Sequence, residues 1–240
     1  MKSILKKLQD DKHYYGAYGK RYLSNSNIGT LLNNPADFGK PQEETLAMVQ
    51  GRYFHVSMLE PHKKDDFQIV DASSRNTNIY KDQSGGSLLL LRKESEALDR
   101  AIEAMKGNDS LSSEIFSENA QYEVPMIGNF FGVEFKGKAD IITEDKIIDI
   151  KTSTGISNFR SKAYAYNYDS QAFIYSSLFG KPFEFFVIDK DTLQMKRFKC
   201  SDEFLERGMN KVERAVNVWN RFFAPDATED VYQYVMEEVL

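Results

Sequence analysis

The segment GKADIITEDKIIDIKTS, residues 137–153, contains two apolar stretches separated by the polar sequence TEDK. Asp140 interrupts the first stretch, and Asp149 and Lys151 interrupt the second. If the stretches pair as an antiparallel hairpin with its turn at residues 144–145, Asp140 lies opposite Asp149, and Lys151 follows on the same face. Two opposed carboxylates repel each other and require a compensating cation. The segment therefore predicts a site for a divalent metal.

The strand register decides this interpretation. Glu-Asp is not a favoured two-residue hairpin turn, and a three-residue loop would send the two Asp side chains to opposite faces, whereas a symmetric four-residue turn keeps them together. The alternative is an exposed ion pair of Asp149 and Lys151 on an edge strand, with Asp140 solvated nearby. In the hairpin, the opposite face is expected to be core and contains Ala139, Ile141, Ile148 and Ile150.

Composition restricts the class of protein. The 240 residues are 41% hydrophobic, and no apolar run approaches the roughly 20 residues that a membrane helix needs. The N-terminal apolar residues are scattered among Lys, Gln and Asp, so export is not expected. The single cysteine, Cys200, excludes an internal disulfide, a thiolate zinc site and a four-cysteine iron–sulfur cluster, and suits a reducing cytoplasm. With a net charge of -5, any nucleic-acid site must be local.

The order of predicted elements indicates an α/β (α+β) fold with a mixed central β-sheet flanked by helices. One domain of residues 1–240 is expected, with a helical lead-in (1–42), a core (43–200) and C-terminal helices (201–240). A long exposed loop is predicted over residues 71–87. Helices are predicted over residues 23–38, 43–61, 92–108, 168–182 (capped by Asp169 or Ser170), 203–223 and 228–238. Strands are predicted over residues 120–128, 130–142, 146–153, 183–189 and 191–200.

Two of these helices carry polar residues at helical spacing. His55 shares one face with Gly51 and Leu59, which lie four residues before and after it. Gln171 and Tyr175 place an amide and a phenol on a face that the hairpin of acidic residues can approach. Taken singly, each has a structural alternative: a buried histidine, a solvated glutamine and a partly buried tyrosine. Their occurrence together in this order is more specific than any one of them.

The combined pattern resembles a known nuclease family. It consists of G-x-x-x-H-x-x-x-L-E-P (residues 51–61), G-K-A-D (137–140), D-I-K-T-S (149–153) and Q-A-F-I-Y (171–175). In this order the motifs resemble the RecB-like branch of PD-(D/E)XK nucleases, and within it the RecE-type exonucleases of phages and prophages. The resemblance covers roughly residues 22–175. It implies a restriction-endonuclease-like core and metal-dependent hydrolysis of DNA phosphodiester bonds.

The resemblance also implies a role for individual residues. The implied metal ligands are His55, Asp140, Asp149 and the carbonyl group of Ile150. Carboxylate, carbonyl and water ligands suit Mg²⁺ or Mn²⁺, and one imidazole tilts the preference slightly toward Mn²⁺.

The implied catalytic residues lie around this site. Lys151 would orient or deprotonate the attacking water, and Gln171 and Tyr175 would hold Lys151 or the DNA backbone. Glu123 would bind a second metal or support Lys151. The chain has no helicase motif such as G-x-x-x-x-G-K-[ST], so a stand-alone exonuclease acting on duplex ends, for recombination or repair, is expected.

Binding of DNA by an acidic protein requires local cations. The candidate phosphate contacts are Arg52, Arg75, Lys136, Lys138, Arg160 and Lys162, and the tyrosines at 164, 166 and 168 are candidates for base stacking. Solvated surface charge is the alternative for residues 162–168. The resemblance further suggests a homo-oligomer and a single-strand annealing protein as partner. Rival hypotheses are an endonuclease or flap trimmer of the same fold, and a catalytically silent DNA-binding scaffold.

Overall fold

A mixed five-stranded sheet forms the centre of the computed structural model, which describes residues 1–235. The strand order is β3-β4-β5-β6-β7, with β5 and β6 parallel and the other neighbours antiparallel. The strands are β3 (Gln121–Phe130), β4 (Val133–Ile142), β5 (Ile147–Ser153), β6 (Phe183–Asp189) and β7 (Met195–Lys199). A separate pair is formed by β1 (Ile69–Val70) and β2 (Leu90–Leu91). The predicted fold class, a mixed sheet flanked by helices, is confirmed.

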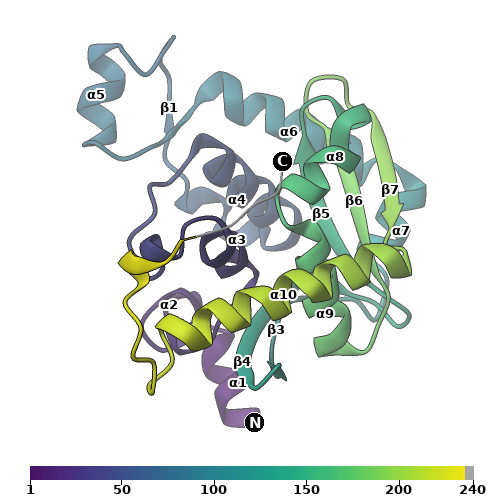
Figure 1. Cartoon of the computed structure of the whole chain (residues 1–240). Coiled ribbons are helices and arrows are strands. Elements are labelled where there is room, and N and C mark those ends of the chain that lie inside the picture. The colour runs from purple at the N-terminus through teal and green to yellow at the C-terminus, as the bar shows by residue number, and fades with distance from the viewer. Residues whose placement is uncertain (236–240) are drawn as a thin grey trace.

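Helices cover both faces of this sheet (Figure 1). The helices are α1 (Lys2–Leu8), α2 (Asp11–Tyr15), α3 (Asn25–Asn33), α4 (Leu46–Leu59), α5 (Asn78–Ser84), α6 (Arg92–Lys106), α7 (Asp109–Ile115), α8 (Phe159–Ala165), α9 (Tyr168–Phe179) and α10 (Asp202–Phe222). Residues of α4, α6 and α7 form one core cluster with β4, β5 and β6, and α8 and α9 pack on the other face. The long α10 lies across α9 and α3. No helix within residues 1–235 is long and apolar enough to cross a bilayer.

The central hairpin has the predicted register but not the predicted carboxylate pair. Ile141 pairs with Ile148 and Ile142 with Ile147, across a four-residue turn in which Thr143 N–H donates to the carbonyl of Lys146. The ladder stops there, so Asp140 and Asp149 are not cross-strand partners. Instead, the backbone N–H of Ile150 donates to Asp140 Oδ2 at 3.1 Å.

The strands part because β3 and β4 change face at the level of Asp140. Tyr122 and Ile141 pack on the α4 side of the sheet, whereas Val124 and Ala139, their neighbours two residues along, pack on the α9 side. Residues two apart on a regular strand project to the same face, so the alternation is broken between them. The prediction that Ala139 and Ile141 share a core face is therefore wrong, although both are fully buried.

Three predicted elements differ from the structure. The expected loop over residues 71–87 contains α5, which Thr77 caps by accepting a hydrogen bond from Tyr80 N–H. The expected helix over 228–238 is absent from its described part, where only a short 3₁₀ turn at Val231–Gln233 occurs, and residues 236–238 lie outside the described residues. The N-cap of α9 is Asn167 rather than Asp169 or Ser170, both of which are buried. Helices α7 and α8 were not predicted.

Candidate active site

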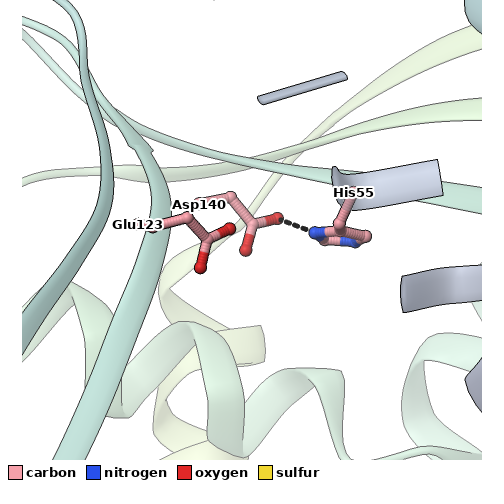
Figure 2. Close-up of side chains that lie close together, drawn as sticks. All are labelled: His55, Glu123 and Asp140. Atoms are coloured by element: carbon pink, nitrogen blue, oxygen red, sulfur yellow. Dashed lines mark ion pairs between the residues drawn. The ribbon is translucent and has the colours of Figure 1, made fainter. Parts of the chain in front are cut away.

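Three elements bring an imidazole and two carboxylates together beside the sheet (Figure 2). His55 comes from α4, Glu123 from β3 and Asp140 from β4. Each offers a ligand atom, and these atoms all lie within 4.8 Å of one another. His55 Nδ1 is 3.3 Å from Asp140 Oδ2, with side chains 24% and 12% exposed. The cluster is therefore partly buried, and its side chains keep some contact with solvent.

The backbone of β3 explains how Glu123 reaches this cluster. Glu123 lies opposite Asp140 in the β3–β4 register, between the pairs Tyr122–Ile141 and Val124–Ala139. Its φ is +51°, a left-handed conformation that is uncommon for residues other than glycine. This residue sits where both strands change face. The strained backbone conformation therefore occurs at the residue whose carboxylate lies beside Asp140.

Asp149 lies next to this cluster but is engaged differently. Its side chain is 2% exposed, and its Oδ2 is 2.5 Å from the ammonium of Lys151. Its Oδ1 accepts a hydrogen bond of 2.6 Å from Gln171 Nε2 on α9. Each carboxylate oxygen has two lone-pair sites, so these contacts leave capacity for a further partner. The alternative of an exposed Asp149–Lys151 pair on an edge strand is excluded, since β5 is central in the sheet and Asp149 is buried.

The backbone of Ile150 faces the acidic residues around Asp140. Its N–H points at Asp140, and the N–H and C=O of one strand residue lie on the same edge. The carbonyl of Ile150 therefore faces the β4 side of β5, where the acidic residues lie. Its side chain is fully buried in the core against α4.

Tyr175 contacts β4 rather than Lys151. A Cβ added to Gly137 would lie 3.2 Å from the Tyr175 ring, so glycine in G-K-A-D permits the close approach of α9. The Tyr175 hydroxyl accepts a hydrogen bond of 3.3 Å from Lys138 N–H. Instead, the ring of Tyr168 lies 5.2 Å from Lys151 Nζ, a cation–π distance. Sequence reasoning treated Tyr168 only as a base-stacking candidate.

Burial and mutual repulsion shift the carboxyl groups of the site. Burial raises the pKa of Asp149 to about 6. The positive charge of Lys151 acts to lower this pKa, and the negative charge of Asp140 acts to raise it. Burial and the charge of Asp140 raise the pKa of Glu123 to about 7. Burial acts to raise the pKa of Asp140 as well, but His55 and Lys151 outweigh it, so the pKa lies below its usual value. Burial and the charge of Asp140 therefore disfavour the ionised forms of Asp149 and Glu123.

The neighbouring carboxylates raise the pKa values of the two basic groups of the site. Burial acts to lower the pKa of Lys151, and the carboxylates of Asp149 and Asp140 outweigh it and raise the pKa above its usual value. The same competition between burial and Asp140 leaves the pKa of His55 raised. Lys151 is therefore an ammonium group and a hydrogen-bond donor at neutral pH.

The donor set fits a divalent metal. His55, Glu123 and Asp140 supply one nitrogen and carboxylate oxygens at converging positions, and Asp149 and the Ile150 carbonyl face the same place. Such oxygen-rich sets suit Mg²⁺ or Mn²⁺. A bound cation would also offset the charge repulsion that raises the pKa values of Glu123 and Asp149. The resemblance implies that Glu123 binds a second metal or supports Lys151, whereas the geometry groups it with His55 and Asp140.

The candidate DNA contacts are scattered and mostly engaged with protein groups. Arg75 forms a two-pronged ion pair with Glu94 (2.8 and 2.6 Å). Arg52 pairs with Glu44 at 2.5 Å on the surface. Lys162 donates to the carbonyl of Thr154. Lys136 and Lys138 are 6% and 8% exposed, and Arg160 is exposed.

The N-terminal residues contribute a partner that sequence reasoning missed. Asp11 on α2 lies 2.5 Å from Lys138 Nζ, and this ammonium is 4.0 Å from the carboxylate of Glu123. No sequence signal indicated this contact, because Asp11 and Lys138 are 127 residues apart.

A mixed sheet that gathers an imidazole, acidic side chains and a lysine at one place defines a PD-(D/E)XK-type protein. The chain belongs to the family described as PDDEXK-like domain of unknown function (DUF3799), whose model matches residues 30–232. The predicted membership of the PD-(D/E)XK superfamily is thereby confirmed.

Solved structures show how far the fold extends. The chain is similar to a crystal structure of an exonuclease candidate from Eubacterium rectale, with a TM-score of 0.68 and 17% identity over 96% of this chain and 95% of that chain. An alkaline exonuclease from Laribacter hongkongensis matches with a TM-score of 0.39 and 13% identity over 90% and 91%. No curated protein matches the chain. The first likeness shows a shared fold over nearly the whole length of both chains.

Proposed function

We propose that residues 1–240 form a single nuclease domain that hydrolyses DNA phosphodiester bonds with Mg²⁺ or Mn²⁺. The observation that carries the proposal is the convergence of His55, Glu123 and Asp140 beside the Asp149–Lys151 pair. A silent scaffold has no need for a buried lysine held against an acidic cluster, because burying unbalanced charge costs stability. This arrangement favours an enzyme over a DNA-binding scaffold.

The metal would be held by His55, Glu123 and Asp140, with Asp149 and the carbonyl of Ile150 as further ligands. When bound, it supplies Lewis acidity at the phosphate and a lower pKa for a water molecule. Lys151, as an ammonium group, donates a hydrogen bond toward the developing negative charge and orients the attacking water. Of the two roles considered for Lys151, orientation is favoured, because a lysine with a raised pKa is a poor proton acceptor.

The helix α9 would position the reacting groups. Gln171 holds Asp149 through its amide, which leaves the second oxygen of Asp149 for Lys151. Tyr175 fixes α9 against β4 at Gly137. We propose that these two residues act on the geometry of Asp149 and Asp140 rather than on DNA directly.

We further propose an exonuclease that acts at duplex ends and produces single-stranded tails for recombination or repair in the cytoplasm. The name of the structural neighbour from Eubacterium rectale, an exonuclease candidate, supports exonuclease over endonuclease or flap cleavage. A homo-oligomer and a single-strand annealing partner belong to the same proposal and rest on the RecE-type resemblance.

The test is a linear duplex labelled at either end, incubated with the protein and Mg²⁺ or Mn²⁺ beside a closed circular duplex. Release of label from the linear duplex alone supports an exonuclease, and the strand that loses label gives the polarity. Cleavage of the circle would favour an endonuclease. Intact DNA with both metals, from a protein whose circular dichroism shows it folded, would favour the silent scaffold.

A further inference from the structure

The first 22 residues differ in charge from the rest of the chain. This N-terminal arm, residues 1–22, contains six Lys and Arg and two Asp, a formal charge of +4. Residues 23–240 contain 25 Lys and Arg and 34 Asp and Glu, a formal charge of -9. The match to the family model begins only at residue 30, so the arm lies outside it.

The basic side chains of the arm are available to a partner. All six are exposed: Lys2, Lys6, Lys7, Lys12, Lys20 and Arg21. None of them forms an ion pair with a carboxylate of residues 1–235. The two acidic residues of the arm have other partners, since Asp10 contacts His13 and Asp11 contacts Lys63 and Lys138. Lys7 and Arg21 lie over the Tyr18 ring, but no carboxylate of residues 1–235 neutralises any of the six cations.

The arm is fixed to the strands that carry the site. Leu8 and Tyr14 are buried, and the Tyr14 ring lies 4.1 Å from Lys136 Nζ and 4.7 Å from Lys138 Nζ. Helix α1 packs against β3, and Gln9 Nε2 donates to the backbone carbonyl of Glu123 at 3.1 Å. Figure 1 shows α1 and α2, in purple, beside the β3–β4 hairpin. The arm is therefore packed against β3 and β4, the strands that carry Glu123 and Asp140.

The exposed surface of the arm leads directly to the acidic cluster. Tyr15, which is 65% exposed, lies 5.4 Å from Lys138 Nζ. The same ammonium lies 4.0 Å from the carboxylate of Glu123. Tyr15 and Asp11 therefore place the arm beside Lys138, next to the carboxylate of Glu123.

We propose that the N-terminal arm binds the sugar–phosphate backbone of the duplex whose end enters the active site. The inference rests on the proposed function, because it takes DNA as the substrate. Exposed cations that neutralise phosphates release condensed counterions, which provides affinity in proportion to the number of contacts. An acidic protein with an acidic active site needs such a source of attraction close to that site.

The experiment compares two triple variants that change the charge equally. The arm variant is Lys6→Gln/Lys7→Gln/Lys12→Gln. The control variant is Lys81→Gln/Lys196→Gln/Lys199→Gln, which removes exposed lysines from α5 and from β7 at the opposite edge of the sheet. Both are made on a Lys151→Ala background with Mg²⁺, and binding of a fluorescent 30-base-pair duplex is followed by anisotropy between 50 and 300 mM salt.

The arm variant is expected to bind about tenfold more weakly, or worse, at 0.1 M salt, with a salt slope shallower by about 2 to 3, as three lost phosphate contacts predict. The control variant is expected to keep the slope of its parent. Equal slopes for the two variants, absence of duplex binding by the parent, or an arm effect on anionic phospholipid vesicles but not on DNA would each overturn the proposal. If the wild-type protein cleaves DNA but the arm and control variants bind alike, only the proposed role of the arm is refuted. If binding depends on the arm but the wild-type protein cleaves no DNA, only the proposed nuclease activity is refuted.

Discussion

The ammonium of Lys151 lies 2.5 Å from the carboxylate of Asp149, two residues earlier on the same strand. The two side chains project to one face of β5, and are 17% and 2% exposed. A third partner, Gln171, reaches Asp149 from α9 at 2.6 Å. The charged pair is thereby held in one orientation beside Asp140.

The first prediction concerns Lys151. Replacing Lys151 by Ala removes the donor beside the reacting phosphate and is expected to lower kcat on linear duplex DNA on the order of 10²- to 10³-fold. Lys151→Arg keeps the charge but not the compact ammonium, and is expected to recover part of the loss. Measured kcat near that of the wild type for Lys151→Ala would rule out the proposed role.

The second prediction concerns Gln171. Gln171→Ala leaves Asp149 Oδ1 without its hydrogen bond, and supporting groups of this kind typically contribute 10- to 100-fold in activity or metal affinity. A fall of that size in kcat, with KM for DNA little changed, is expected. Gln194→Ala, at an exposed position of the β6–β7 connection, is the control and should behave as the wild type. A change in KM alone would instead indicate that Gln171 contacts DNA.

The third prediction concerns pH and metal binding. The carboxyl pKa values of about 6 for Asp149 and about 7 for Glu123 mean that protons compete with a metal below neutral pH. Both values are raised above those of the unfolded chain, so without metal their contribution to stability is largest at low pH and is lost as pH rises through 6 to 7. Millimolar Mn²⁺ is therefore expected to raise Tm more at pH 8 than at pH 5.5.

The matched variant for this measurement is Glu123→Gln, which removes the group with the higher pKa. Its Tm shift with Mn²⁺ should be smaller than that of the wild type at pH 8. An equal Tm shift at both pH values for the wild type would contradict the assignment of these carboxylates as ligands.

The fourth prediction concerns a buried ion pair away from the metal site. Asp169 on α9 is fully buried, and Lys211 on α10 lies 2.8 Å from it, with the exposed Arg207 at 3.3 Å. Lys211→Met leaves the carboxylate without its buried partner and should cost about 3 kcal/mol of unfolding free energy. Urea denaturation measures this cost, with the exposed Lys196→Met as control. A loss below about 1 kcal/mol would mean that Arg207 and water satisfy Asp169.

Local sequence signals predicted much of the sheet and the longer helices. The apolar runs that contain Ile148 and Ile150 defined β5, and the hairpin register at Ile141 and Ile148 followed from the symmetry of the turn. Helix α6 ends at Lys106, followed by Gly107, as its amphipathic pattern and glycine stop indicated. Exposed helices with local caps, such as α5 after Thr77, were missed because their polar composition resembles that of a loop.

By itself, the sequence determined the fold class and supplied the candidate site residues: His55, Glu123, Asp140, Asp149, Lys151 and Gln171. Only the tertiary structure decided their partners. Because β3 and β4 change face together, Asp140 lies beside Glu123 and His55 rather than across from Asp149. The contacts of the N-terminal arm with Lys138 and Glu123 span more than 100 residues of chain. Such contacts depend on how a twisted sheet and its helices pack, which no local pattern of residues encodes.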